Sequence, residues 1–406
     1  MQTQLAEFIK HTPQGIEADS ILRSCVHCGF CTATCPTYNL LGDELDGPRG
    51  RIYQIKLVLE GQAANRTTQL HLDRCLTCRN CETTCPSGVQ YGRLLDIGRE
   101  VVSTQVSRSV RQQTMRWMLR KLLTTKGLFE PCLRVGRMVR PLLPAVLKNK
   151  IPLIQEVPSL PTESFQRKII LAEGCVQPAY KPATNITVKR VLHRLGIEAI
   201  TVSAERCCGA VSHHLDAHEE AKQMMRANID AWWPYIEAGA EAIVSSASGC
   251  GVLIKDYGHI LRDDINYAEK ACKVSDITRD LVEIIDQEDL SKLEIDAPRR
   301  VAFQAPCTLQ HGQKLAGRVE NILRDLGFNL TSVPDPHFCC GSAGTYSILQ
   351  KDLSTRLQQR KIENLQSDAP QAIVTANIGC QLHLESVAKV PVMHWIELLD
   401  DAAVQL

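Results

Sequence analysis

The stretch Cys25-Val-His-Cys28-Gly-Phe-Cys31-Thr-Ala-Thr-Cys35-Pro36 contains four cysteines and ends in a proline. The same arrangement returns fifty positions later, in Cys75-Leu-Thr-Cys78-Arg-Asn-Cys81-Glu-Thr-Thr-Cys85-Pro86. Both copies read C-x2-C-x2-C-x3-C-P. The short gaps let three thiolates converge within one tight loop, and the proline ends the loop by fixing φ and removing an N–H donor. The chain therefore opens with a duplicated motif suited to an inorganic group.

This spacing is the one by which bacterial-type ferredoxins hold two [4Fe–4S] clusters, with the fourth cysteine of each motif bound to the other cluster. Zinc is the alternative, since Zn²⁺ also binds four thiolates. A zinc site needs only two CxxC pairs, however, and would leave the third evenly spaced cysteine of each motif unexplained. We therefore assign one iron–sulfur cluster to Cys25, Cys28, Cys31 and Cys85, and a second to Cys35, Cys75, Cys78 and Cys81.

The composition is that of an ordinary globular protein of 406 residues, with 44% hydrophobic and 22% charged residues, long enough for several domains. No apolar run reaches the roughly eighteen residues needed to span a bilayer, and the N-terminus lacks the basic and apolar regions of a secretory signal. Eighteen cysteines, mostly in metal-type clusters, fit a reducing compartment better than a disulfide scaffold. We expect a cytoplasmic protein.

Residues 1–100 are expected to form a helix-rich ferredoxin-type domain. Between the two motifs, Gly47-Pro48 marks a turn that precedes a helix. Arg49 and Arg51 at its start either lie beside an anionic cluster or are solvated. The face of this helix that periodicity assigns to the core consists of Ile52, Ile55, Val58 and Leu59.

Residues 101–166 are expected to contain two basic amphipathic helices and, over residues 151–166, a linker. Between residues 101 and 150 there are eleven Lys or Arg and one acidic residue, Glu130. We expect breaks in the helices at Gly127 and Pro131. Such helices lie on an anionic membrane surface or dock an acidic partner, and the alternative is a surface helix with solvated arginines. The charge bias favours contact with a membrane or a partner over solvation, so we expect peripheral membrane contact through residues 101–150.

From residue 167 onward one pattern occurs twice, in residues 167–296 and 297–406. An apolar run ending in a cysteine is followed by a helix, a Cys-Cys-Gly triplet, a second helix and another apolar run ending in a cysteine. The first cysteine lies 32 positions before the first cysteine of the triplet in both copies. The second cysteine of the triplet lies 42 positions before the last cysteine in the first copy and 40 in the second. This is an internal duplication.

Short apolar strands that alternate with helices predict an α/β fold with mainly parallel sheets. The second helix of the first copy is expected over Ala217–Glu237, capped at Asp216 and interrupted near Pro234.

Ligands of such sheets bind outside the carboxyl ends of the strands, so each copy is expected to gather four thiols at one sheet edge. Neighbouring glycines let the backbone approach a bulky inorganic group. Two alternatives stay open: the cysteines are small buried hydrophobic residues, or vicinal thiols form a redox-active dithiol. The thiols are Cys175, Cys207, Cys208 and Cys250 in the first copy, and Cys307, Cys339, Cys340 and Cys380 in the second.

The duplicated C…CC-G…C pattern resembles the cysteine-rich CCG domain of heterodisulfide reductases. Anaerobic glycerol-3-phosphate dehydrogenases and the iron–sulfur subunits of lactate- and glycolate-oxidising complexes share this domain. The order of ferredoxin motifs, basic helices and two CCG repeats most resembles the glycolate oxidase iron–sulfur subunits. The resemblance covers nearly the whole chain and includes Asn228-Ile-Asp-Ala-Trp-Trp-Pro and Thr375-Ala-Asn-Ile-Gly-Cys380-Gln.

The resemblance implies an electron-transfer subunit of a complex that oxidises glycolate to glyoxylate. It implies an FAD-containing partner subunit that takes two electrons from glycolate. It also implies a quinone that receives these electrons from the present chain at the cytoplasmic face of the inner membrane. Equivalent subunits of lactate or glycerol-3-phosphate dehydrogenases, and a heterodisulfide reductase-type subunit, are the alternatives.

The sequence itself shows no site for an organic substrate. It has no dinucleotide fingerprint, P-loop, HExxH motif or Ser-His-Asp arrangement. No helix-turn-helix with a basic stripe indicates nucleic-acid binding. We therefore assign no catalytic residue and no nucleic-acid partner.

The repeats depart from the fuller CCG pattern, which ends in C-x-x-C, because the last positions here are Leu253 and His383. Four cysteines per repeat still suffice for a further iron–sulfur centre. His383 is either a nitrogen ligand, as histidine is in Rieske centres, or a helix residue with an ordinary partner. The remaining candidates, which show no metal-ligand spacing, are His213, His214, His311 and His394.

Overall fold

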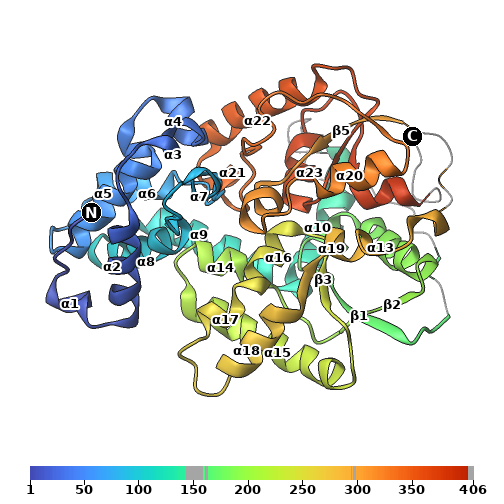
Figure 1. The fold of residues 1–406 in the computed structure, drawn as a ribbon, viewed down its shortest axis with the longest axis horizontal. Coiled ribbons are helices and arrows are strands. Elements are labelled where there is room, and N and C mark those ends of the chain that lie inside the picture. Colours follow the sequence, from blue (N-terminus) through green and yellow to red (C-terminus); the bar gives the residue numbers. More distant parts are fainter. Residues whose placement is uncertain (143–158, 161–162, 294, 296–298, 401–406) are drawn as a thin grey trace.

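The structure is a computed structural model that describes residues 1–142, 159–160, 163–293, 295 and 299–400. In Figure 1 the N-terminal helices, in blue, lie beside two lobes that each contain a sheet, the first green to yellow and the second orange to red. The predicted α/β class with a helical N-terminal part is confirmed.

The N-terminal part is entirely helical among its regular elements. Its core forms where α5 (Pro48–Leu59) and α8 (Tyr91–Gln105) cross closely at Gly98, where a Cβ would lie 2.6 Å from Ile55 Cγ1. The predicted buried face of α5 is confirmed, since its four residues are at most 3% exposed. The elements are α1 (Glu7–Lys10), α2 (Pro13–Ser24), α3 (Phe30–Ala33), α4 (Pro36–Leu41), η1 (Glu44–Asp46), α5 (Pro48–Leu59), α6 (Arg66–Asp73), α7 (Asn80–Thr84) and α8 (Tyr91–Gln105).

The basic segment forms α9 (Val110–Thr124), α10 (Lys126–Val139) and the short turn η2 (Arg140–Leu142). The expected breaks at Gly127 and Pro131 are wrong, because both residues lie inside α10 and the helices separate at Thr125 instead. A proline removes one helical hydrogen bond, but buried Phe129 and Leu133 on either side anchor the helix to the protein. The linker predicted over residues 151–166 lies mostly outside the described residues.

Much of the positive charge at the start of this segment is paired within the chain. Arg108 contacts Asp73 at 2.5 Å and Asp216 at 3.0 Å, and Arg116 contacts the same two carboxylates at 3.2 and 3.5 Å. Because Asp73 ends α6 and Asp216 lies in the first CCG repeat, these ion pairs join the N-terminal helices to that repeat. These two arginines are therefore not solvated, and they bind carboxylates of the same chain instead of a membrane or a partner protein.

Each CCG repeat contains one four-stranded sheet in which every pair of neighbouring strands is parallel. The strand orders are β2-β1-β3-β4 and β6-β5-β7-β8, which are the same topology. The duplication read from the cysteines is therefore a duplication of the fold. The strands are β1 (Arg167–Ala172), β2 (Ile197–Ile200), β3 (Ile243–Ser245) and β4 (Thr278–Asp280), then β5 (Arg300–Gln304), β6 (Asn329–Leu330), β7 (Ala372–Thr375) and β8 (Val392–His394).

Helices connect successive strands in both repeats. The first repeat has α12 (Gln177–Tyr180), α13 (Pro182–Arg194), α14 (Ala210–His214), α15 (His218–Glu237), α16 (Ser248–Lys255), α17 (Tyr257–Ile260), α18 (Ala268–Ile277), α19 (Leu281–Ile285) and η3 (Leu290–Lys292). The second has the π-turn η4 (Thr308–Gly312), α20 (Arg318–Asp325), α21 (Tyr346–Leu349), α22 (Lys351–Gln366), α23 (Ile378–Glu385) and η5 (Trp395–Leu399).

Two expectations for α15 are wrong. Asp216 does not cap it, because this residue has φ 63° and its carboxylate pairs with Arg108. The helix also runs through Pro234 to Glu237. The proline lies in the last turns, and Trp232 just before it is buried in the core and fixes that end.

The two repeats share one hydrophobic core. Ile169 and Leu171 of β1 belong to the same buried cluster as Val301 and Phe303 of β5 and Trp395 of η5. Direct bonds also join the repeats, including one from Ser248 N–H to Ala376 O at 3.1 Å. Among the described residues, no helix is both long enough and apolar enough to cross a membrane.

Candidate functional site

The two ferredoxin-type loops repeat the same backbone conformation. His27 and Gly29 in the first loop and Thr77 and Arg79 in the second are equivalent positions, and all four have positive φ, between 52° and 88°. This left-handed geometry is uncommon for residues other than glycine. It curls each loop around its thiols, as a compact metal centre requires.

The structure brings Cys25, Cys28, Cys31 and Cys85 together around a small cavity. Burial raises the pKa of Cys31 to about 11, with the neighbouring thiols of Cys25, Cys85 and Cys28 adding to the increase. Thiols this close cannot ionise together unless a cation lies among them. The set therefore fits an iron–sulfur cluster, which supplies that positive charge.

The second set is more deeply buried. Burial raises the pKa of Cys81 well above its usual value, and the thiols of Cys78, Cys75 and Cys35 raise it further. The Tyr91 hydroxyl lies 3.6 Å from Cys75 Sγ and can donate a hydrogen bond to it. The donor set again fits a cluster.

Of the two arginines singled out in the sequence, Arg51 lies among the second set, whereas Arg49 lines the cavity around the first set. Arg51 is 1% exposed, and the charges of Cys75, Tyr91, Cys35 and Asp46 raise its pKa although burial alone would lower it. Arg49 is partly exposed and pairs with Glu44 at 2.7 Å. A buried positive charge therefore accompanies the second thiol set.

In the first CCG repeat, four thiols from three strand ends meet. Cys175 follows β1, Cys207 and Cys208 follow β2, and Cys250 lies in α16 after β3. Cys175 Sγ is 3.4 Å from Cys207 Sγ. Hydrogen bonding with Cys207 and Cys250, together with burial, raises the pKa of Cys208 well above its usual value.

The second repeat reproduces this arrangement. Cys307 Sγ lies 3.9 Å from Cys339 Sγ, and Cys340 is hydrogen-bonded between Cys339 and Cys380. Asn377 donates to Cys380 Sγ at 3.4 Å. The predicted gathering of four thiols at each sheet edge is thus what the structure shows, and the donor sets fit an inorganic centre as well as a dithiol.

The positions that replace cysteine in the CCG pattern behave differently from ligands. Leu253 is 5% exposed and belongs to the core of the first repeat. His383 Nε2 lies 3.3 Å from Ser354 Oγ, and burial lowers the pKa of His383 to about 4. His383 thus has the ordinary partner of a helix residue.

One cavity of about 1830 Å³ adjoins all eight CCG thiols and Cys78 of the ferredoxin-type part. Cys78 and Cys307 both pack against the buried cluster that contains Cys339. Burial raises the pKa of Cys78, and the Cys307 thiol raises it further. Leu76 packs with Cys339 and Tyr346 in one buried cluster. The second ferredoxin-type set therefore borders the second CCG set directly.

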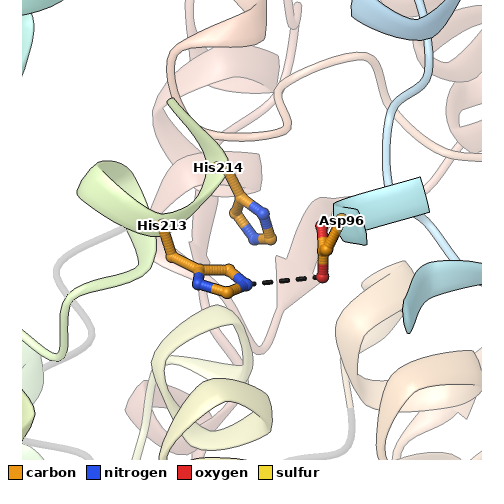
Figure 2. A group of neighbouring side chains, drawn as sticks. All are labelled: Asp96, His213 and His214. Atoms are coloured by element: carbon orange, nitrogen blue, oxygen red, sulfur yellow. Dashed lines mark hydrogen bonds and ion pairs between the residues drawn. The ribbon is translucent and has the colours of Figure 1, made fainter. Parts of the chain in front are cut away.

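Sequence spacing missed a group of polar residues on the same cavity. His213 Nε2 lies 3.3 Å from Asp96 Oδ2, and His214 points toward the same carboxylate (Figure 2). Burial disfavours the charged imidazole, but Asp96 outweighs it and raises the pKa of His213. The adjacent histidines were visible in the sequence, but Asp96 lies on α8, over a hundred positions earlier. The other two histidines have ordinary partners: His311 contacts His337 O, and His394 contacts Ser246 O.

Four sets of four cysteines, two of them in ferredoxin-type loops, define an iron–sulfur protein of the electron-transfer class. Residues 21–89 match the 4Fe-4S dicluster domain family, and residues 170–255 and 301–385 match the cysteine-rich CCG domain family.

The chain is 53% identical to the glycolate oxidase iron-sulfur subunit of Escherichia coli (strain K12), over 99% of both chains. It is 28% identical to the probable glycolate oxidase iron-sulfur subunit of Bacillus subtilis (strain 168), over 94% of both. It is 29% identical to lactate utilization protein A of Geobacillus thermodenitrificans (strain NG80-2), over 57% of this chain and 98% of that one. The chain belongs to the family of glycolate oxidase iron–sulfur subunits.

Proposed function

We propose that this chain is the electron-transfer subunit of a glycolate dehydrogenase complex that oxidises glycolate to glyoxylate. Two electrons enter from an FAD-containing partner subunit and leave to a quinone. The observation that carries the proposal is that Cys78 of the ferredoxin-type part packs against the same buried cluster as Cys307 and Cys339 and lines the same cavity. Adjoining redox sites are what a relay requires, and the similarity over nearly the full chain supports glycolate as the donor.

The proposed ligands follow the grouping predicted from the sequence, and the effects of neighbouring thiols on the pKa values of Cys31 and Cys81 support that grouping. One [4Fe–4S] cluster would be held by Cys25, Cys28, Cys31 and Cys85, and the other by Cys35, Cys75, Cys78 and Cys81. Such clusters carry single electrons. We propose the matching division into a ferredoxin-type domain (1–100), a basic segment with linker (101–166) and two CCG domains (167–296 and 297–406).

The chain's own residues set the conditions for this chemistry rather than perform it. Burial of Cys35, Cys75 and Cys81 shields most of the second set from water, while Cys78 lines the large cavity. The fixed positive charge of Arg51 favours added negative charge there, so it favours the reduced state of a bound cluster. No residue of the chain is assigned to the oxidation of glycolate.

A further iron–sulfur centre in the CCG repeats forms part of the proposal. The eight thiols are arranged in two equivalent groups at the carboxyl ends of parallel strands, where α/β sheets bind their ligands. A cluster in the second group would extend the relay from Cys78 into the large cavity. Simple hydrophobic packing does not account for so many thiols in contact with one another.

We propose that the basic segment makes peripheral contact with the cytoplasmic face of the inner membrane. Support comes from the exposed apolar side chains beside its unburied arginines. Val110 is 79%, Trp117 53%, Val135 58% and Met138 78% exposed. Apolar side chains among arginines are typical of helices that lie on anionic bilayers.

The decisive experiment is anaerobic purification of the native complex, with iron and acid-labile sulfide counted per chain and the partners identified. We expect a flavoprotein, glycolate-dependent quinone reduction and more than about eight irons, the number in two [4Fe–4S] clusters. About eight irons would leave the CCG repeats without a cluster. Oxidation of lactate instead of glycolate would favour the lactate alternative, whereas zinc in place of iron and no flavoprotein would refute the relay.

A further inference from the structure

Asp96, His213 and His214 form a group of possible metal ligands apart from every cysteine set. Asp96 projects from α8, and the two histidines end α14, so the group bridges the N-terminal helices and the first CCG repeat. One ligand atom from each residue lies within 4.8 Å of the others, and Asp96 Oδ2 is 3.3 Å from His213 Nε2. Two ligands bound tetrahedrally to one ion at about 2.0–2.2 Å lie roughly 3.3 Å apart.

The opposite side of His213 has the partner that a metal-binding histidine requires. Nδ1 of His213 lies 3.3 Å from Nδ1 of His218. If His213 donates its Nδ1–H there, its Nε2 keeps a lone pair that faces the Asp96 carboxylate. Two acceptor atoms at that distance need a proton or a metal ion between them, so this site can exchange the one for the other. Metal-binding histidines generally give their other N–H to such a partner, which orients the ring.

We propose that Asp96, His213 and His214 bind one divalent first-row transition metal ion of the Zn²⁺ or Fe²⁺ type. Two imidazoles and a carboxylate are a donor set that these ions share. Three protein ligands leave one coordination position open, and all three residues line the large cavity. The ion would also fasten the ferredoxin-type part to the first CCG repeat.

The charged neighbours leave room for a cation. Arg79 of the second cysteine loop is paired with Asp256 at 2.8 Å. Arg99 on α8 directs its guanidinium to the carbonyl oxygens of Leu72 and Cys75. Both positive charges are therefore engaged by other acceptors.

Zinc retention tests the proposal on the full, cluster-containing chain purified without oxygen. Zn²⁺ is added, unbound metal is removed by gel filtration, and zinc and iron are counted by mass spectrometry. We expect wild type to retain one zinc ion more per chain than His213→Ala or His214→Ala, with equal iron in all three. His259→Ala is the matched control, because His259 lines the same cavity but faces Glu17 at 3.2 Å. It should retain zinc as wild type does.

Two further measurements separate this site from the thiols and from misfolding. X-ray absorption at the zinc edge should show nitrogen or oxygen at about 2.0–2.2 Å rather than sulfur at about 2.3 Å. His218→Ala should weaken zinc binding by about 10- to 100-fold, as loss of an orienting partner does. If an alanine variant loses iron, Asp96→Asn is measured in its place, because asparagine has nearly the same shape as aspartate. The proposal would be overturned if wild type and the ligand variants retained equal amounts of zinc, or if the bound zinc showed only sulfur ligands. The Asp96–His213 contact would then be an ordinary hydrogen bond.

Discussion

Arg51 is at the centre of a buried ion-pair network beside the second thiol set. Its Nη2 lies 3.3 Å from Asp46 Oδ1, and its Nε donates to His71 O at 2.7 Å. Asp46 is itself fully buried and also pairs with Arg74 at 2.8 Å. Charges buried in this way are stable only as a complete network.

Arg51→Met should therefore lower the free energy of unfolding by about 3–5 kcal/mol, because it leaves a buried carboxylate with too little positive charge. Iron per chain should fall with it. Anaerobic denaturant unfolding and iron analysis measure both effects. Arg49→Gln is the control: its partly exposed pair with Glu44 should contribute at most about 1 kcal/mol. Equal losses in the two variants would mean that burial of Arg51 has no special effect.

His394 makes stability depend on pH. Ile396 N–H donates to its Nδ1 and its Nε2–H donates to Ser246 O, so the neutral ring satisfies both atoms. Burial lowers the pKa of His394 to about 4, against about 6.5 in the unfolded chain. The unfolded state therefore binds the proton first as pH falls. The stability from this residue is fully present above about pH 6.5, declines below it and is lost near pH 4.

Between pH 7.5 and 5.5 this residue should lower the free energy of unfolding by about 1.4 kcal/mol. The thermal midpoint of the protein, followed without oxygen, should fall accordingly. His394→Gln cannot take up a proton in this range, so its midpoint should change less over the same interval. Parallel pH profiles for the two proteins would exclude His394 as the cause.

At the scale of elements, α10 presents a pair of strongly exposed apolar side chains to solvent. Val135 and Met138 are three residues apart, so they share one helix face. Replacing both by glutamate should weaken binding to vesicles of anionic phospholipid at least about tenfold, since burial of each side chain contributes about 1.5–3 kcal/mol. Vesicle sedimentation measures the change.

Ile265→Glu provides the control for that experiment, because Ile265 is 96% exposed in the first CCG repeat, away from α9 and α10. It should leave vesicle binding unchanged. If wild type does not sediment with anionic vesicles at all, the basic segment has another role.

The sequence predicted the positions of helices and strands better than it predicted where they end and which charged side chains pair. The apolar runs before Cys175, Cys250, Cys307 and Cys380 predicted four of the eight strands in the described part of the chain, because a buried parallel strand is a short apolar run. The helix break expected at Pro131 was wrong because the tertiary packing of its neighbours outweighed the low helix propensity of proline. The pairing of Arg108 with Asp73 and Asp216 joins residues far apart in sequence, and no local pattern encodes it.

For the molecule as a whole, spacing gave a grouping of the cysteines, which stays a prediction for the ferredoxin-type clusters, but it gave no arrangement of the groups in space. The C-x2-C-x2-C loops and the repeated triplet fix local geometry, so the thiols could be grouped from the sequence. The contact between Cys78 and the second repeat, and the meeting of Asp96 with His213, arise from packing between domains.

Cys78→Ser tests the proposed relay at the point where the two domains meet. It should abolish glycolate-dependent quinone reduction, while the partner flavoprotein still reduces an artificial dye. Cys272→Ser is the matched control and should leave quinone reduction unchanged, because Cys272 is exposed and belongs to none of the four cysteine sets. Quinone reduction that survives Cys78→Ser would contradict the relay.

Cys340→Ser asks what the CCG thiols contribute to the whole molecule. Cys340 is buried and hydrogen-bonded between Cys339 and Cys380, so a cluster there should depend on it. We expect both quinone reduction and iron per chain to fall relative to wild type and to Cys132→Ser, a variant of an exposed cysteine outside the sets. Loss of activity with unchanged iron would instead indicate a redox-active dithiol. Unchanged activity and iron would identify the second CCG set as hydrophobic packing, and the relay would then have to end at the ferredoxin-type clusters.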